Sequence, residues 1–164
     1  MNKAYKAAFS GILLALSAAI SAVETLIPLP LGVKPGFSNL PVMTAISELG
    51  TGISFSIVLL KSLFVLLTRG ATAFFMSLSG GLLSFAVMLL IFRKTRASFL
   101  LISLCGALAH NAGQIIAACF IMYNTAVLSY LPVLIVSGTV AGIVTGIAAN
   151  LIIPKLKPFL RRTK

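Results

Sequence analysis

Predominantly apolar runs, separated by short polar breaks, cover most of the chain. Most of these runs have the roughly 20 residues that a helix needs to cross the hydrocarbon core of a bilayer. We therefore predict an all-α integral membrane protein with a single membrane domain, residues 1–164, and six transmembrane helices. The predicted spans cover residues of about 7–27, 39–49, 52–69, 71–92, 98–123 and 128–153.

The count of six depends on a break at residues 50–52, where two glycines flank a threonine, and on the placement of charge. The run at 39–49 is short, so it crosses fully only if it borrows flanking residues or is buried by its neighbours. With six spans and both termini in the cytoplasm, only Lys34 and Arg69 face outside, while Lys61 lies within a span. Five spans would place a basic cluster outside, against the cytoplasmic preference of lysine and arginine. The basic residues that six spans place in the cytoplasm are Lys3, Lys6, Arg93, Lys94, Arg96, Lys155, Lys157, Arg161, Arg162 and Lys164.

Composition supports a multi-pass protein of the cell membrane. Hydrophobic residues make up 59% of the chain and charged residues 9%, well below the roughly 25% of soluble domains, so the bilayer is the expected solvent. The net charge of +11 lies in short clusters between apolar runs, which is the cytoplasmic-loop bias and not a nucleic-acid surface. A cleaved signal peptide is disfavoured because the first run is long and several further spans follow it.

The same composition excludes most enzyme classes. Glu24 and Glu48 are the only acidic residues, and two isolated glutamates cannot supply the carboxylates with which a prenyl diphosphate synthase holds magnesium. No Gly-Lys dipeptide occurs, so the chain lacks the phosphate-binding loop of nucleotide hydrolases. Cys105 and Cys119 fit no zinc pattern and are interpreted as packing residues. We expect no catalytic site, no cofactor and no metal.

Small residues recur every fourth position in two of the predicted helices. Such stripes let helix backbones approach closely in lipid, where hydrophobicity does not drive helix association. In the last helix we favour packing within the chain. In the first helix, packing within the chain and docking of a separate membrane subunit are about equally expected. The two stripes are Ala7, Gly11, Ala15 and Ala19 in the first helix, and Gly138, Gly142, Gly146 and Asn150 in the last.

Polar side chains within the spans cost several kcal/mol unless they find partners, so each one needs an explanation. They gather toward the outer half of the predicted bundle, and we expect them to line a polar cavity that opens to the outside. The alternatives are that His110 only bridges two helices and that Lys61 pairs with Glu24 or a carbonyl. The candidates are Glu24, Lys61, Ser77, His110, Asn111 and Gln114.

The segment at 32–39, with the sequence GVKPGFSN, is predicted to be a defined turn on the outer side. Ser38 or Asn39 can cap the following helix, and Pro41 is tolerated in a first helical turn. A helix N-terminus beside Lys34 would attract an anionic group such as a carboxylate or phosphate. The alternative is a rigid external loop whose lysine faces lipid headgroups.

Several segments together resemble the so-called Gx transporter family, over residues of roughly 11–152. Sequences of this kind are also labelled component I of heptaprenyl diphosphate synthase. The family is similar to the substrate-binding S components of energy-coupling-factor (ECF) vitamin transporters. The segments are Glu24 with Ile27-Pro28, residues 32–39, Ser77-Leu78-Ser79-Gly80-Gly81 with Met88, residues 106–114 (GALAHNAGQ), and Tyr130-Leu131-Pro132 followed by the glycine stripe.

The resemblance implies a six-helix S component that works with a coupling transmembrane subunit and two ATPase subunits. In such proteins the first helix carries a small-residue stripe that faces the coupling subunit, and the first external loop closes over the substrate. The matching positions here are the stripe from Ala7 to Ala19 and the segment 32–39. The expected substrate is a small, anionic molecule, either vitamin-like or a quinone or isoprenoid precursor.

Within that function, Lys34 and Lys61 would neutralise the anionic group, while Ser77, Asn111 and Gln114 would hydrogen-bond polar edges of the substrate. Two other functions stay open. One is a non-catalytic membrane accessory subunit of a heptaprenyl diphosphate synthase. The other is a solitary channel or proton-linked carrier that uses Glu24 and His110.

Overall fold

The computed structural model describes residues 3–27, 29 and 33–161, and these residues form helices with no strand among them. The predicted all-helical class is therefore confirmed. Four helical stretches are long and apolar enough to cross a membrane, which makes the chain a multi-pass membrane protein: Lys3–Leu26, Thr51–Lys94, Phe99–Met122 and Thr125–Pro158. The elements in chain order are α1 (Lys3–Val23), η1 (Glu24–Leu26), α2 (Asn39–Glu48), α3 (Thr51–Lys94), α4 (Phe99–Met122), η3 (Thr125–Tyr130) and α5 (Leu131–Arg161).

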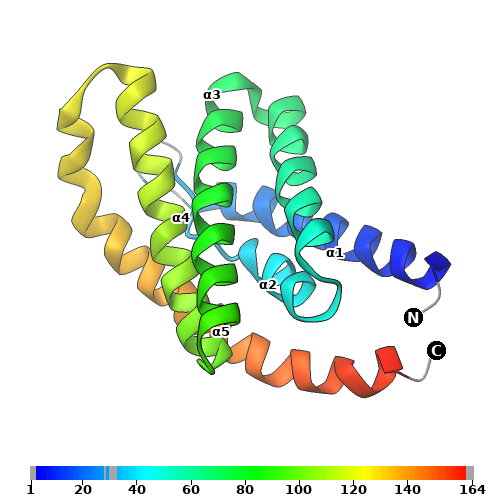
Figure 1. Cartoon of the computed structure of the whole chain (residues 1–164). Helices are drawn as coiled ribbons and strands as arrows, with labels where there is room; N and C mark the ends of the chain where they lie inside the picture. Colours follow the sequence, from blue (N-terminus) through cyan, green and yellow to red (C-terminus); the bar gives the residue numbers. More distant parts are fainter. Residues whose placement is uncertain (1–2, 28, 30–32, 162–164) are drawn as a thin grey trace.

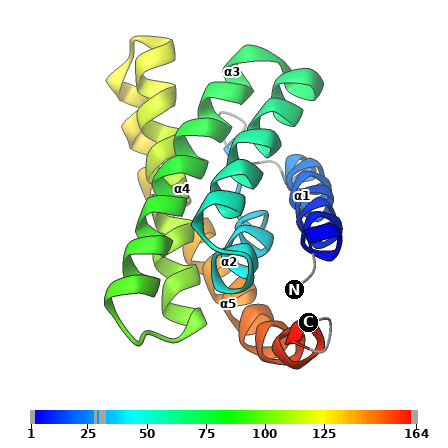
Figure 2. The same cartoon turned by 45° about the vertical axis from the view of Figure 1, so that its right-hand side comes forward.

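The long helix α3 is a hairpin of two antiparallel arms (Figures 1 and 2). The reversal occurs at Gly70, whose φ of 82° and ψ of −177° are not helical and suit glycine, which has no Cβ to clash. The arms, residues 51–69 and 71–94, correspond to two of the predicted spans. The total of six spans and the compartment of each terminus remain predictions.

Helix α2 is short and buried. Its ten residues reach about 15 Å, half the thickness of the hydrocarbon core. Every residue from 41 to 46 is buried, and α2 packs against α1, α3 and α5. Burial by neighbours is thus how this short run is accommodated. Gly50, with a φ of 90°, makes the break before α3.

Helix α4 packs between α3 and α5, and glycines bring its backbone close to both. A Cβ at Gly113 would lie 2.7 Å from the Cα of Gly80 on α3, so the two backbones touch. A Cβ at Gly142 or Gly146 would lie 2.7 Å from a Cα of α4. The glycine stripe of the last helix therefore packs within the chain, as predicted, whereas Asn150 at its end is exposed.

The small-residue stripe of α1 faces away from the bundle. A Cβ at Gly11 would meet no atom within 4 Å, and the opposite face of the helix carries the buried Leu13, Ser17 and Ser21. No described residue therefore packs closely on Gly11. The exposed stripe consists of Ala7, Gly11, Ala15 and Ala19.

The two ends of the described chain lie on the same side of the molecule. In Figures 1 and 2 the start of α1 and the end of α5 are close to each other. The last part of α5, orange to red in Figure 1, runs in a different direction from its start, and Pro154 lies within the helix. Proline removes a helical hydrogen bond and commonly bends a helix.

We predict that Gly142→Leu destabilises the protein, because its Cβ would overlap the backbone of α4 and overpacking costs about 1–3 kcal/mol. The melting temperature in a mild detergent should fall clearly. Gly11→Leu is the matched control: it has free space around it and replaces a poor helix former, so its melting temperature should be unchanged or higher. Equal melting temperatures for both variants would contradict the assigned α4–α5 contact.

Candidate functional site

The segment from residue 33 to 38, here called the inserted loop, enters the interior of the bundle as non-helical chain. Val33, Lys34, Gly36 and Ser38 are all buried. Buried loop backbone is uncommon, because its N–H and C=O groups must find partners away from water. Gly32, which begins the segment predicted from the sequence, lies outside the described residues.

Gln114 of α4 pairs with the backbone of the inserted loop. The N–H of Lys34 donates to Oε1 of Gln114 over 3.0 Å, and Nε2 of Gln114 donates to the carbonyl of Lys34, also over 3.0 Å. One side chain thus satisfies both backbone groups of one residue. This interaction joins the loop to the middle of the bundle.

Glu24, in η1, holds the same loop from the other side. Its Oε1 accepts a hydrogen bond of 2.7 Å from the N–H of Gly36, while its Oε2 is buried and has no partner. Only 2% of the Glu24 side chain is exposed, so an unused carboxylate oxygen here is costly.

Lys61, in the first arm of α3, contacts the end of the inserted loop. It is 1% exposed, and its Nζ donates to Oγ of Ser38 over 3.3 Å. Ser17 of α1 donates to the carbonyl of Ser38 over 2.8 Å. A buried ammonium with a single neutral acceptor keeps most of its capacity to bind an anion.

His110 and Asn39 surround Gly36 of the inserted loop. A Cβ at Gly36 would lie 3.4 Å from Nδ2 of Asn39 and 3.6 Å from Cδ2 of His110, and the φ of this glycine is 100°. Nδ1 of His110 and Nδ2 of Asn39 are both buried without a hydrogen-bond partner. Gly36 is therefore enclosed by three side chains, counting Glu24, each of which has an unpartnered polar atom.

These side chains define the inner polar cluster. Its members contact or surround the inserted loop: Glu24, Asn39, Lys61, His110 and Gln114. Asn111 adjoins this cluster, because its Oδ1 accepts a hydrogen bond of 3.5 Å from Nε2 of Gln114, while its Nδ2 donates to the carbonyl of Leu134 on α5 over 2.7 Å. Ser77 has another partner: its Oγ lies 3.5 Å from Oγ of Ser62 in the other arm of α3.

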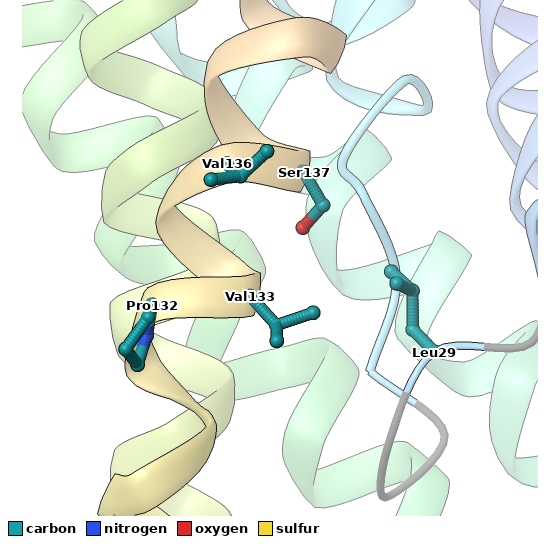
Figure 3. Close-up of a pocket in the computed structure, with 5 residues that line it drawn as sticks. All are labelled: Leu29, Pro132, Val133, Val136 and Ser137. Atoms are coloured by element: carbon teal, nitrogen blue, oxygen red, sulfur yellow. The ribbon is translucent and has the colours of Figure 1, made fainter.

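The predicted polar groups meet around the inserted loop, not around an open cavity. A pocket of about 350 Å³ beside Glu24 has otherwise apolar walls, including Val23 and Phe37. A second pocket, of about 460 Å³, lies between the start of α5 and Leu29, which faces Val133 and Ser137 (Figure 3). No member of the inner polar cluster lines that second pocket.

The side chain of Lys34 leaves the cluster and turns toward α1. Its Nζ donates to the carbonyl of Ser21 over 2.8 Å and to Oγ of Ser21 over 2.6 Å. Burial, with the positive charge of Arg69 as the second cause, lowers the pKa of Lys34 to about 8, while Glu24 acts in the opposite direction. The backbone of Lys34 therefore contacts the inner polar cluster through Gln114, whereas its side chain lies outside that cluster, against Ser21 of α1.

Sequence reasoning missed Ser17 and Ser21, and it gave Ser38 only a capping role; Ser38 does stand at the N-cap of α2, but its side chain makes no capping hydrogen bond. Ser17 and Ser21 are buried on α1, and Glu24 follows them one turn later. The spacing of four and then three residues puts all three on one face of a helix, a signal that was present in the sequence. Each serine alone is too common in membrane helices to stand out.

Comparison with models of known protein families assigns the chain to one family. The family model described as heptaprenyl diphosphate synthase component I matches residues 13–152. The chain belongs to this family. The match confirms the family resemblance, whereas the likeness to ECF S components remains a prediction. No curated protein and no solved structure matched the chain.

We predict that Gln114→Leu releases the inserted loop, because it removes both hydrogen bonds to Lys34. At about 1 kcal/mol for each bond, amide hydrogen exchange at residues 33–38 should accelerate roughly tenfold or more. Asn124→Ala is the control, since it also removes a side-chain bond to the backbone, to the N–H of Ala126, but lies outside the inner polar cluster. Unchanged exchange in the leucine variant would contradict the assigned role of Gln114.

Proposed function

We propose that this member of the component I family is the substrate-capturing membrane component of an ECF-type importer. The observation that carries the proposal is that each of the three side chains enclosing Gly36 keeps one unpartnered buried polar atom: Oε2 of Glu24, Nδ2 of Asn39 and Nδ1 of His110. Buried polar groups are nearly always paired, and in a bilayer an unpaired one costs several kcal/mol. Retaining three at one place is expected where a solute supplies the missing partners.

The inserted loop is held by side-chain hydrogen bonds, and a solute could form the same bonds in its place. Its backbone is bonded to side chains of Glu24 and Gln114, and its Ser38 hydroxyl to Lys61. Withdrawal of the loop would free the same donors and acceptors for a ligand without breaking a helix. Lys61 would then neutralise an anionic group, and Gln114, Asn39 and His110 would bind polar edges of the ligand.

The substrate that best fits these groups is small and anionic. Two ammonium groups, of Lys34 and Lys61, lie near a single carboxylate, that of Glu24, so the loop region is short of negative charge. A vitamin-like anion and a quinone or isoprenoid precursor both satisfy this requirement. In this function Ser77 and Asn111 support the helices that carry the site.

Import requires energy from partner proteins, which the family resemblance implies are a coupling transmembrane subunit and two ATPases. The exposed stripe from Ala7 to Ala19 on α1 is the expected contact with the coupling subunit, because small residues let a second helix approach closely. We place six spans in the cell membrane with both termini in the cytoplasm, as the distribution of basic residues favours, and the second span then consists of the buried inserted loop together with the short α2.

The second candidate function is a non-catalytic accessory subunit of a heptaprenyl diphosphate synthase. The description of the family favours it. In this function the chain would hold a soluble synthase at the membrane, and all chemistry would belong to the partner. The unpartnered atoms around Gly36 have no evident use in such an anchor, which is why we rank import first.

We predict that the purified chain carries a small molecule, and that Lys61→Met lowers its recovery at least tenfold. Loss of a buried charged hydrogen-bond partner costs about 1.5–3 kcal/mol, which corresponds to this reduction. Mass spectrometry of the denatured protein measures moles of solute per mole of chain. Lys94→Met removes an exposed lysine from the end of α3 and should leave recovery unchanged.

The proteins that copurify decide between the two functions. Import is supported if ATPases and a coupling subunit copurify with the wild type, and if Ala15→Leu loses these proteins but keeps the solute. Recovery of a prenyl synthase with no solute supports the accessory function and overturns import.

A further inference from the structure

A polar pocket separate from the inner polar cluster lies between α1 and the first arm of α3, beside the side chain of Lys34. Its volume is about 190 Å³. Unlike the other pockets described above, it is lined by two basic side chains and three hydroxyls. The lining residues that matter are Ser21, Thr25, Lys34, Phe64, Thr68 and Arg69.

The two basic residues of this pocket lack an acidic partner. Nζ of Lys34 is bonded to Ser21 alone, and no ion pair is found for Arg69 among the described residues. Glu24, the nearest source of negative charge, is bonded to Gly36 on the inserted loop. Two like charges facing one small pocket repel each other, and an anion placed between them would remove that cost.

The pocket also offers hydroxyl groups. Oγ1 of Thr25 is bonded to the carbonyl of Ala22, and Oγ1 of Thr68 to the carbonyl of Phe64, so each hydroxyl stays close to its own helix. A hydroxyl can rotate to donate to a new acceptor. Together with the fork of an arginine and the ammonium of a lysine, these donors match the several oxygens of a phosphate better than a single carboxylate.

The pocket is open at the surface, since Thr25, Phe64, Thr68 and Arg69 in its lining are exposed. Exposed apolar side chains are next to these residues in the sequence: Leu26 is 80% exposed and Leu67 is 86% exposed. Arg69 directly precedes the turn of α3 at Gly70, which lies at one end of the hairpin in Figure 1. A basic pocket at a helix end beside lipid-facing side chains suits a ligand with a charged head and an apolar chain.

We propose that this pocket binds the phosphate or diphosphate group of an amphiphile whose apolar chain lies along α1 and α3. The site shares Lys34 with the inserted loop but not the inner polar cluster. Its occupancy therefore does not depend on the proposed import function. An anion here would also hold the inserted loop to α1 through Lys34.

Because the chain contains no tryptophan, Phe64→Trp provides a single fluorescent reporter in the pocket wall. In dodecyl maltoside, dioctanoyl phosphatidic acid should change its fluorescence saturably. Dioctanoylglycerol, which has the same chains without phosphate, should not. Adding Arg69→Gln should weaken the affinity at least tenfold, whereas Arg96→Gln, the same charge change in the α3–α4 connection, should alter it less than twofold.

Inorganic phosphate and diphosphate distinguish the two sources of the anion. Saturation by either at the same pocket indicates that a free phosphate compound suffices, and saturation by phosphatidic acid alone indicates a lipid headgroup. The proposal is overturned if phosphatidic acid does not bind, whether or not the free anions do, or if Arg96→Gln weakens binding as much as Arg69→Gln.

If Phe64→Trp does not fold, native mass spectrometry of phosphatidic acid adducts on the wild type and on Arg69→Gln replaces the fluorescence. Loss of these adducts in Arg69→Gln supports the site, and equal retention overturns it. The copurified solute should be the same in both proteins. Its absence from both would refute import while leaving the phosphate site intact.

Discussion

The structure depends on one constraint: the non-helical backbone of residues 33–38 lies inside the protein, so its N–H and C=O groups must find partners there. Gln114 satisfies both backbone groups of Lys34, and Glu24 satisfies the N–H of Gly36. These interactions join the loop after α1 to the middle of α4. A polar interior is therefore required by the loop itself, and the proposed function depends on the buried polar atoms that remain unpartnered after the loop is satisfied.

Glycine determines where these polar groups can meet. The close approach of α3 and α4 at Gly80 and Gly113 places the backbone of His110 against α3, since a Cβ at Gly80 would lie 2.8 Å from the carbonyl of His110. A larger residue at either glycine would push the helices apart and widen the space around Gly36. Packing of small residues, which is the main source of helix association in lipid, thus also determines the geometry of the site.

Membership in the component I family leads us to expect a membrane subunit that acts with partner proteins, and the arrangement of α1 and the inner polar cluster is compatible with that. The family match covers α2, α3 and α4 completely, the second half of α1 and most of α5, and it includes every residue of the inner polar cluster. A membrane subunit that acts with partners needs one surface for them and, if it carries a solute, one interior site. The exposed stripe of α1 and the cluster around Gly36 are separate features of the same fold, so the proposed partner surface and the proposed solute site can be mutated independently.

The all-helical membrane class, the breaks at Gly50 and Gly70 and the packing role of the last glycine stripe could be predicted from the sequence, because each depends on local properties: apolar length, or the absence of a Cβ. Only the tertiary structure decided that the inserted loop fills the interior, that Lys34 turns toward Ser21, and that Asn111 bonds to α5. Lys34 and Gln114 are 80 residues apart, and whether they meet depends on how each helix is rotated. That rotation is the result of packing among all the helices, which no single segment encodes.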